Sequence, residues 1–385
     1  MAVDHQVASR QELLARTTEL LPRLRERGLD TEKARRIPDA TIADLKDAGL
    51  LRIPNPERYG GYEHDIDLVF EVAMEIGRAC GASAWCYAVW SIHNWMIGHW
   101  PEQAQEEYFA NGPDTLSSSA FAPKGRLEPT EGGYLLSGQW DFSSGSDGGS
   151  WVMLGALAPE GVCMALLPRT DYEIIDTWFV SGLSGTGSKD IRVESAFVPL
   201  HRVSAIMSPV VDPAVFEMHG RASYRLPPMS FLPFTLCSPL VGMAQGAIDE
   251  LIERLQGKTG PGRTSESVAI QLRLAESSAE VDAARLIVRT RTARLIERAG
   301  LGEQPSEVEQ AAIRRDYAYV AKLCVSAVNR LFEASGGHSL YESEAMQRFH
   351  RDVHAGSHQM ALYWDPIAEG YGRALLGLPP LLPAR

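Results

Sequence analysis

The sequence has little of what marks several large classes of protein. It carries a formal net charge of −12 over 385 residues, and nucleic-acid binding requires a basic surface that such a chain lacks. We found no uninterrupted apolar run close to the roughly 20 residues of a membrane-spanning helix. The N-terminus has no apolar signal core. We therefore expect a cytoplasmic protein with neither nucleic acid nor membrane as a partner.

Cysteine is also scarce, and the five cysteines follow no spacing typical of a zinc site or a disulfide framework. We expect them to be reduced core residues. No Gly-x-Gly-x-x-Gly motif follows a strand, which disfavours a nicotinamide-dinucleotide fold. The stretch SGLSGTGSK does not have the order of a P-loop, and SSGSDGGS is too degenerate for a nucleophile elbow. The cysteines are Cys80, Cys86, Cys163, Cys237 and Cys324.

What is present is a change of hydrophobic period along the chain, which predicts three domains. Residues 1–113 show helical spacing, and ACGASAWCYAVWSIHNWMIGHW is apolar nearly all round, as in a buried helix. Residues 114–211 contain short apolar runs between Gly, Ser, Pro and Asp, typical of a small antiparallel β domain. Residues 212–385 return to long helical patterns. The predicted fold is mainly α with a central β domain.

The third block has the pattern of a helical bundle. Leu274, Val281, Val288 and Leu295 recur at heptad spacing, with charged residues between them. Such a repeat buries one stripe of a helix against its neighbours. We predict a C-terminal four-helix bundle.

Three histidines, His350, His354 and His358, stand at every fourth position of FHRDVHAGSHQM. On a helix, neighbours four apart rise about 6 Å and share a face, so the three could form a metal site, an acid/base site or a solvated face. The outer two are separated by about 12 Å along the axis and cannot bind one ion. No Cys or acid cluster supplies a further ligand, so we predict no metal.

Four local motifs, in this order of domains, resemble the acyl-CoA dehydrogenase superfamily over nearly the whole chain. They are SSAFAP (Ser118–Pro123), LSGQWDFSSG (Leu136–Gly145), GTGSKDIRVESAFVP (Gly185–Pro199) and GGHSLYESEAMQRFHRD (Gly336–Asp352). The resemblance implies an N-terminal helical domain, a β domain and a C-terminal four-helix bundle around a flavin.

Within that superfamily, WDFSSGSD, GTGSKD and RDVHAGSH resemble the oxygenase components of two-component flavin-dependent aromatic hydroxylases. A dehydrogenase of this superfamily needs a carboxylate to remove a proton next to a thioester carbonyl. The aligned positions here hold Ala355 or Met360, and the other known location, SFLPFTLCSPL, contains no acid. Dehydrogenation is therefore disfavoured.

The resemblance implies a division of labour between two proteins. A separate NAD(P)H-dependent flavin reductase would supply reduced flavin, as FMNH2 or FADH2. The oxygenase would add dioxygen, form a flavin hydroperoxide and hydroxylate a small aromatic substrate, most simply a phenol. The chamber must be dry, because water and stray protons promote loss of the peroxide.

The resemblance also assigns residues to the cofactor. Ser144 matches the position whose hydroxyl bonds flavin N5, with Ser143 as the alternative if the register shifts by one. Trp140 and Phe142 would stack against or wall the flavin, and Phe121 lies in the strand along its edge. Each of these residues also fits a plain strand or turn role.

Two histidines match catalytic positions of the resembled family. His93 would face the place where peroxide and substrate meet, although a core histidine would look the same. His358 would point at the substrate ring, where a free imidazole, with a pKa near 6.5, suits a base at neutral pH. Gly336 and Gly337 would approach the far end of the flavin across a subunit interface, implying a homotetramer; a helix C-cap needs the same residues.

Other functions stay open at this point. The same fold can oxidise nitrogen or sulfur in an amino sugar or another heteroatom compound, where a phenol base is unnecessary. An acyl-CoA dehydrogenase-like enzyme with an unusual base is a second alternative. A helical assembly protein that kept the scaffold without flavin is the third.

Overall fold

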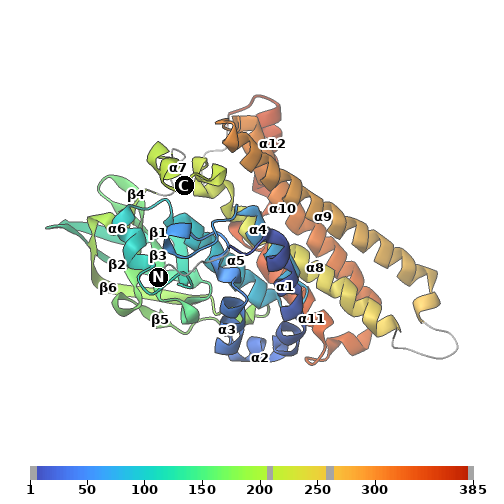
Figure 1. Ribbon diagram of the computed structural model, residues 1–385. Helices are drawn as coiled ribbons and strands as arrows, with labels where there is room; N and C mark the ends of the chain where they lie inside the picture. The colour runs from blue at the N-terminus through green and yellow to red at the C-terminus, as the bar shows by residue number, and fades with distance from the viewer. Residues whose placement is uncertain (1–6, 206–210, 257–263, 380–385) are drawn as a thin grey trace.

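The computed structural model describes residues 7–205, 211–256 and 264–379. In these residues three units follow one another along the chain: short helices, a β-sheet and a bundle of long helices. Figure 1 shows the sheet on one side, the long helices on the other, and the first helices against both. The predicted fold class is confirmed.

The described part of the N-terminal unit contains six α-helices, and α5 is its central element. Every residue of α5 is buried, as its all-round apolar sequence predicts. The first helix begins at a capping box in which the Ser9 hydroxyl and the Glu12 carboxylate bond each other's backbone N–H. The six are α1 (Arg10–Glu26), α2 (Gly28–Ala34), α3 (Asp39–Asp47), α4 (Asp67–Gly77), α5 (Gly81–Ile97) and α6 (Glu102–Tyr108).

The sheet has seven strands in the order β5-β6-β2-β1-β3-β4-β7. The prediction of an antiparallel domain was wrong in one place, since β1 and β3 pair in parallel. After β2 the chain crosses through a turn at Ser146–Gly148 to the other edge of β1, so β3 runs in the direction of β1. The strands are β1 (Ser117–Thr130), β2 (Gly133–Ser143), β3 (Trp151–Ala158), β4 (Gly161–Pro168), β5 (Glu173–Ile175), β6 (Lys189–Pro199) and β7 (Val203–Ser204).

The C-terminal unit is the predicted bundle. Val281, Val288 and Leu295 are buried on one stripe of α9, and Leu274 is partly buried there, so the heptad interpretation is confirmed. The short α7 (Pro213–His219) precedes the bundle, and α12 (Trp364–Leu375) packs on α10 after it. The bundle helices are α8 (Leu232–Gln256), α9 (Val268–Gly300), α10 (Glu307–Ser335) and α11 (Ala345–Ser357).

Helix α8 corrects the expectation about apolar runs. By length and composition alone the segment Pro228–Gln256 could cross a bilayer, with mean hydropathy 1.4 over its best window, but 83% of that window is buried inside the protein. It is a core helix that contacts α4, α5, α10 and α11. Gly242 permits its close crossing with α4, because a Cβ there would lie 2.2 Å from the Met74 carbonyl oxygen.

All five cysteines are buried and free, as predicted. The predicted boundary after residue 113 lies between the end of α6 at Tyr108 and the start of β1 at Ser117. The predicted boundary after residue 211 adjoins residues 206–210, which lie outside the described residues.

Candidate active site

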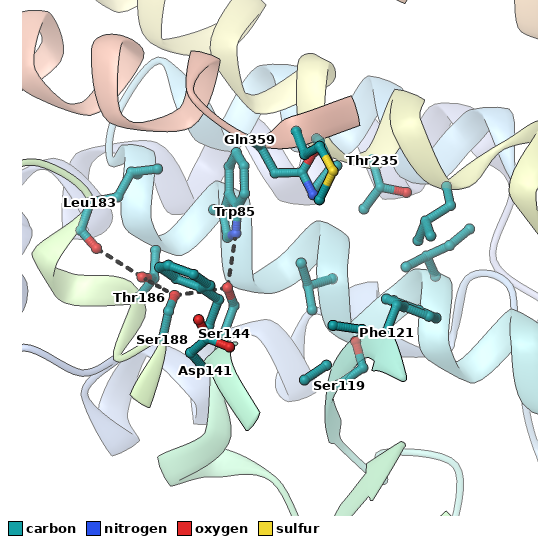
Figure 2. A pocket seen from close by; sticks show the side chains of 18 of the residues that line it. Trp85, Ser119, Phe121, Asp141, Ser144, Leu183, Thr186, Ser188, Thr235 and Gln359 are labelled. Carbon is teal, nitrogen blue, oxygen red and sulfur yellow. Dashed lines mark hydrogen bonds between the residues drawn. The ribbon is translucent and has the colours of Figure 1, made fainter. Parts of the chain in front are cut away.

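A cavity of about 670 Å³ lies where the three units meet. Its walls come from α5, β1, the end of β2, the segment before β6, the start of α8 and the end of α11 (Figure 2). This volume is within the range of about 300–1,000 Å³ that is usual for sites of small organic ligands. Most lining side chains are apolar or aromatic, among them Trp85, Val89, Ile92, Phe121, Trp178 and Leu236.

His93 lies on the inner wall, on α5, and is only 1% exposed. Its Nδ1 is 2.7 Å from the Ser117 carbonyl oxygen, which can only accept, so Nδ1 carries the hydrogen. Its Nε2, 2.8 Å from Ser119 Oγ, then accepts from that hydroxyl. Burial lowers the pKa of His93 to about 4, against the opposing effect of the Ser117 carbonyl. At neutral pH the ring is uncharged, with a defined tautomer.

Ser144 stands just beyond the end of β2, on the wall next to α5. Its Oγ accepts a hydrogen bond from Trp85 Nε1 at 3.2 Å and lies 2.8 Å from Ser188 Oγ. Figure 2 shows this group on one side of the cavity and Ser119 with Phe121 on the other. The cavity therefore has hydroxyl groups on two sides of an otherwise apolar space.

A β-bulge decides which residues near Ser144 reach the cavity. Between the pairs Trp140–Ile191 and Ser143–Lys189, β2 has one residue more than β6. Phe142 sits in this bulge with φ of 65° and is 66% exposed, lining the cavity. Without the bulge, strand alternation would put Phe142 on the face of Trp140.

Two of the residues predicted at the flavin, Trp140 and Ser143, do not line this cavity. Trp140 does not line the cavity: it is fully buried in the core of the sheet, where its Nε1 donates to the Gly155 carbonyl at 2.7 Å. Ser143 is also fully buried and outside the lining, so Ser144 alone of the two serines reaches the cavity. Trp85 and Trp178 take the wall position that was predicted for Trp140.

His358 lies at the C-terminal end of α11, on the exposed rim of the cavity. Its Nδ1 is 2.7 Å from the His354 carbonyl oxygen. Because a carbonyl only accepts, Nδ1–H donates and Nε2 of the neutral ring keeps its lone pair. The contact orients His358 as a proton acceptor.

The other two histidines of the four-residue repeat have a different environment. The Nε2 atoms of His350 and His354 lie 3.0 and 2.7 Å from Asn329 Oδ1, and His350 stacks on Phe332. Burial lowers the pKa of both rings. Among the described residues no group of three or more His, Cys, Asp or Glu side chains is placed to hold a metal ion. These two histidines pack the bundle.

Comparisons with known proteins agree with this geometry. Residues 10–112 match the family model described as "Acyl-CoA dehydrogenase, N-terminal domain", and residues 234–363 match "Acyl-CoA dehydrogenase, C-terminal domain". The chain is 36% identical to the flavin-dependent monooxygenase oxygenase subunit HsaA of Rhodococcus jostii, over 95% of this chain and 98% of that protein. It belongs to this family of flavin-dependent monooxygenases.

Two further relatives support the assignment to this branch of the acyl-CoA dehydrogenase fold. The FADH2-dependent resorcinol hydroxylase oxygenase component of a Rhizobium species is 31% identical, over 96% of this chain and 95% of that protein. The crystal structure of 3-HSA hydroxylase from Rhodococcus sp. RHA1 superimposes with a TM-score of 0.92 at 34% identity, covering 96% of this chain and 98% of the other. The predicted family is confirmed.

The lining agrees with a monooxygenase rather than a dehydrogenase. Ala355 and Met360, the two positions aligned with the dehydrogenase base, both line the cavity and neither is an acid. Asp141 is the one carboxylate among the described lining residues. It pairs with Lys124, and that hydrogen bond lowers the pKa of Asp141. A carboxylate held in this way is a poor base.

The structure brings together some predicted site residues of the monooxygenase and separates others. Five of the predicted residues line the cavity: Phe121, Phe142, Ser144, His93 and His358. Gly336 and Gly337 follow the end of α10 and do not line the cavity of the single chain.

Several lining groups were not found from the sequence. Ser119 was inside the quoted SSAFAP motif, but only the fold shows that it bonds His93. Thr186 and Ser188 were inside GTGSKD, where they resemble ordinary turn residues. Thr235 and Gln359 line the cavity without any recognisable motif. A strand-alternation argument could have found Ser119. The lining positions of Thr186, Ser188 and Gln359 depend on loop geometry, and that of Thr235 depends on how α8 packs.

Proposed function

We propose that this chain is the oxygenase component of a two-component monooxygenase that hydroxylates a small phenolic substrate with reduced flavin and dioxygen. The observation that carries the proposal is the convergence of Ser144, His93 and His358 on one apolar cavity from three distant segments. The names of the relatives, which include hydroxylases of aromatic compounds, support the same chemistry.

The residues around the cavity fit a flavin. Phe142 and Trp178 meet edge to face, with ring centroids 6.0 Å apart, and leave most of Phe142 uncovered. Exposed aromatic surface beside a cavity is suited to covering a flat ring system. Ser144 adds a polar contact at the same wall. When bound, reduced flavin supplies the electrons that activate dioxygen for transfer to the substrate.

His358 is the proposed base. A phenol that donates to its Nε2 gives up its proton on the way to the transition state, and the ring becomes a better nucleophile. The rim position lets His358 pass that proton to water. The apolar inner wall meanwhile excludes water from the reacting atoms.

His93 and Ser119 are proposed to orient the reactants inside the cavity. Because the Ser119 hydroxyl donates to His93, its lone pairs are free to accept a hydrogen bond from a group in the cavity. His93 itself is held neutral and acts through Ser119. This pair therefore accepts a hydrogen bond from a donor group of the reactants other than the phenolic O–H that faces His358.

The proposed partners follow from the same assignment. An oxygenase component works with a separate flavin reductase, and we propose an NAD(P)H-dependent one. We also propose a homotetramer in the cytoplasm, with Gly336 and Gly337 contacting the cofactor of a neighbouring subunit. Support comes from the outer face of α9, where Val268, Leu272 and Leu286 are each more than 60% exposed.

The test is single-turnover mixing of the protein with FADH2 or FMNH2, oxygenated buffer and a panel of simple phenols. We expect a product one oxygen atom heavier, seen by mass spectrometry, with label from ¹⁸O2. Binding of reduced flavin with no labelled product from any phenol would overturn the proposed reaction.

A further inference from the structure

Three hydroxyl groups form a continuous hydrogen-bonded chain that starts at the cavity and ends on a backbone carbonyl (Figure 2). Ser144 Oγ is 2.8 Å from Ser188 Oγ, which is 2.7 Å from Thr186 Oγ1. Thr186 Oγ1 in turn is 2.8 Å from the Leu183 carbonyl oxygen. Of its members, only Ser144 has a role in the proposed function.

The number of hydrogens determines the direction of every bond in it. Three O···O contacts of hydrogen-bond length need three hydrogens, and the three hydroxyls supply one each. The Leu183 carbonyl has none, so Thr186 donates to it. Thr186 must then accept from Ser188, and Ser188 must accept from Ser144. Reversing the chain would leave two oxygens facing each other at 2.8 Å without a hydrogen.

The buried end of the chain is fixed in place. Thr186 and Ser188 are 1% and 4% exposed, so water does not offer them other partners. Leu183 has a left-handed backbone with φ of 53°, and its N–H is 2.6 Å from the buried Asp352 carboxylate of α11. The carbonyl that terminates the chain is thereby held between the β unit and the bundle.

Ser144 consequently reaches the cavity as an acceptor. Its hydrogen is engaged by Ser188, and one of its lone pairs accepts from Trp85 Nε1. What is left for a ligand is the second lone pair. A ligand atom at this position is favoured if it carries a hydrogen and disfavoured if it presents a lone pair of its own.

We propose that the Ser144–Ser188–Thr186 chain makes the site selective for the oxidation state of its cofactor. N5 of a reduced flavin carries a hydrogen, whereas N5 of an oxidised flavin has only a lone pair. An acceptor-only Ser144 thus favours the reduced form and releases the oxidised form. This inference rests on the proposed function, with Ser144 at the flavin N5 edge, and it makes Ser188 and Thr186 positioning residues for redox selectivity.

The experiment is equilibrium binding of oxidised FAD and FMN, and of both reduced flavins under anaerobic conditions. Thr186→Val removes the acceptor for Ser188. Ser188 can then donate to Ser144, and the hydrogen of the Ser144 hydroxyl becomes available to a ligand in the cavity. We expect oxidised flavin to bind about five- to tenfold more tightly, the size of one hydrogen bond, with little change for reduced flavin. The Leu183 carbonyl keeps two donors, the N–H of residue 186 and Trp178 Nε1.

Three further variants test whether the hydroxyl chain itself sets the ratio of the two dissociation constants. Thr186→Ser restores the hydroxyl and should restore the wild-type ratio of the two dissociation constants. Ser188→Ala breaks the chain at another point and should lower that ratio like Thr186→Val. Ser184→Ala, in the same segment but outside the chain, should leave the ratio as in the wild type.

The outcomes separate this inference from the proposed function. If the wild type prefers reduced flavin and Thr186→Val and Ser188→Ala keep the same preference, the inference is overturned but the proposed function is not. Equal affinity of the wild type for both oxidation states does the same. A wild-type protein that binds neither form overturns the proposed function as well.

Discussion

The inner wall and the rim of the cavity each carry one histidine, and the two differ in burial and in hydrogen bonding. His93 is buried on α5, has both ring nitrogens hydrogen-bonded and has a pKa lowered to about 4. His358 is exposed at the end of α11, with one nitrogen bonded to a carbonyl and the other without a partner among the described residues. The same side chain is thus held uncharged at one place and left able to accept a proton at the other.

The difference shows that surroundings, rather than residue type, separate the two proposed roles. A group that exchanges protons needs access to water and an unoccupied nitrogen, which the rim provides. A group that must not gain charge near a reactive oxygen species is better buried and saturated with hydrogen bonds. The predictions below test this separation.

The largest effect is expected for His358→Ala. Loss of the proposed base should slow hydroxylation of a phenol by roughly 100- to 10,000-fold at neutral pH. The deficit should shrink as the pH approaches about 10, where a phenol ionises unaided. The measurement is single-turnover product formation across pH with saturating reduced flavin. A pH-independent loss, or one of only a few fold, would remove His358 from proton transfer.

The second prediction concerns the pH dependence of stability that His93 confers. The unfolded chain takes up a proton at this imidazole below about pH 6.5, whereas the folded protein does so only near pH 4. The contribution of this group to the free energy of unfolding is therefore complete above pH 6.5 and is lost as the pH falls. The loss approaches roughly 3 kcal/mol near pH 4. Urea unfolding of the wild type and His93→Gln at pH 7 and pH 4 measures the difference.

That comparison must be made between the two proteins rather than within one. The buried Asp352 carboxyl, whose pKa burial raises to about 6, acts in the opposite direction, and the buried His99 acts in the same direction as His93. Both effects cancel when the variant is subtracted from the wild type. Equal acid sensitivity of the two proteins would mean that His93 is not held neutral by the fold.

A smaller effect is expected for Ser119→Ala. The change leaves His93 Nε2 without its donor in a buried position, which should lower the unfolding free energy by about 1 kcal/mol. Ser118→Ala is the matched control, because the buried Ser118 hydroxyl has no hydrogen-bond partner among the described residues and its removal should cost little. Equal losses in both variants would argue against the His93–Ser119 bond.

The smallest effect on activity is expected for His350→Gln. This histidine belongs to the same four-residue repeat as His358, but it bonds Asn329 and stacks on Phe332 inside the bundle. We expect hydroxylation within about twofold of the wild type and a loss of about 1 kcal/mol in unfolding free energy. A tenfold loss of activity in a stable variant would contradict the division between rim and bundle histidines.

Much of the scaffold could be predicted from local pattern. The heptad in α9 and the apolar sequence of α5 gave helices whose burial the structure confirms. The parallel pairing of β1 with β3 could not be predicted, because strand periodicity does not report which edge a crossing strand joins. Nor could the opposite faces of Trp140 and Phe142, since the extra residue that follows Trp140 in β2 reverses the faces beyond it.

The sequence by itself determined the family and the order of the three units, and it nominated His93, Ser144 and His358 as site residues. Motifs and periodicity can be read from neighbouring residues of one segment. Only the tertiary structure decided which nitrogen of each histidine is free and which way the Ser144 hydroxyl points. Those properties depend on carbonyls from other segments, Ser117 and Leu183 among them. Hydrogen-bond direction is a property of the assembled site, because each donor needs an acceptor that folding alone brings near.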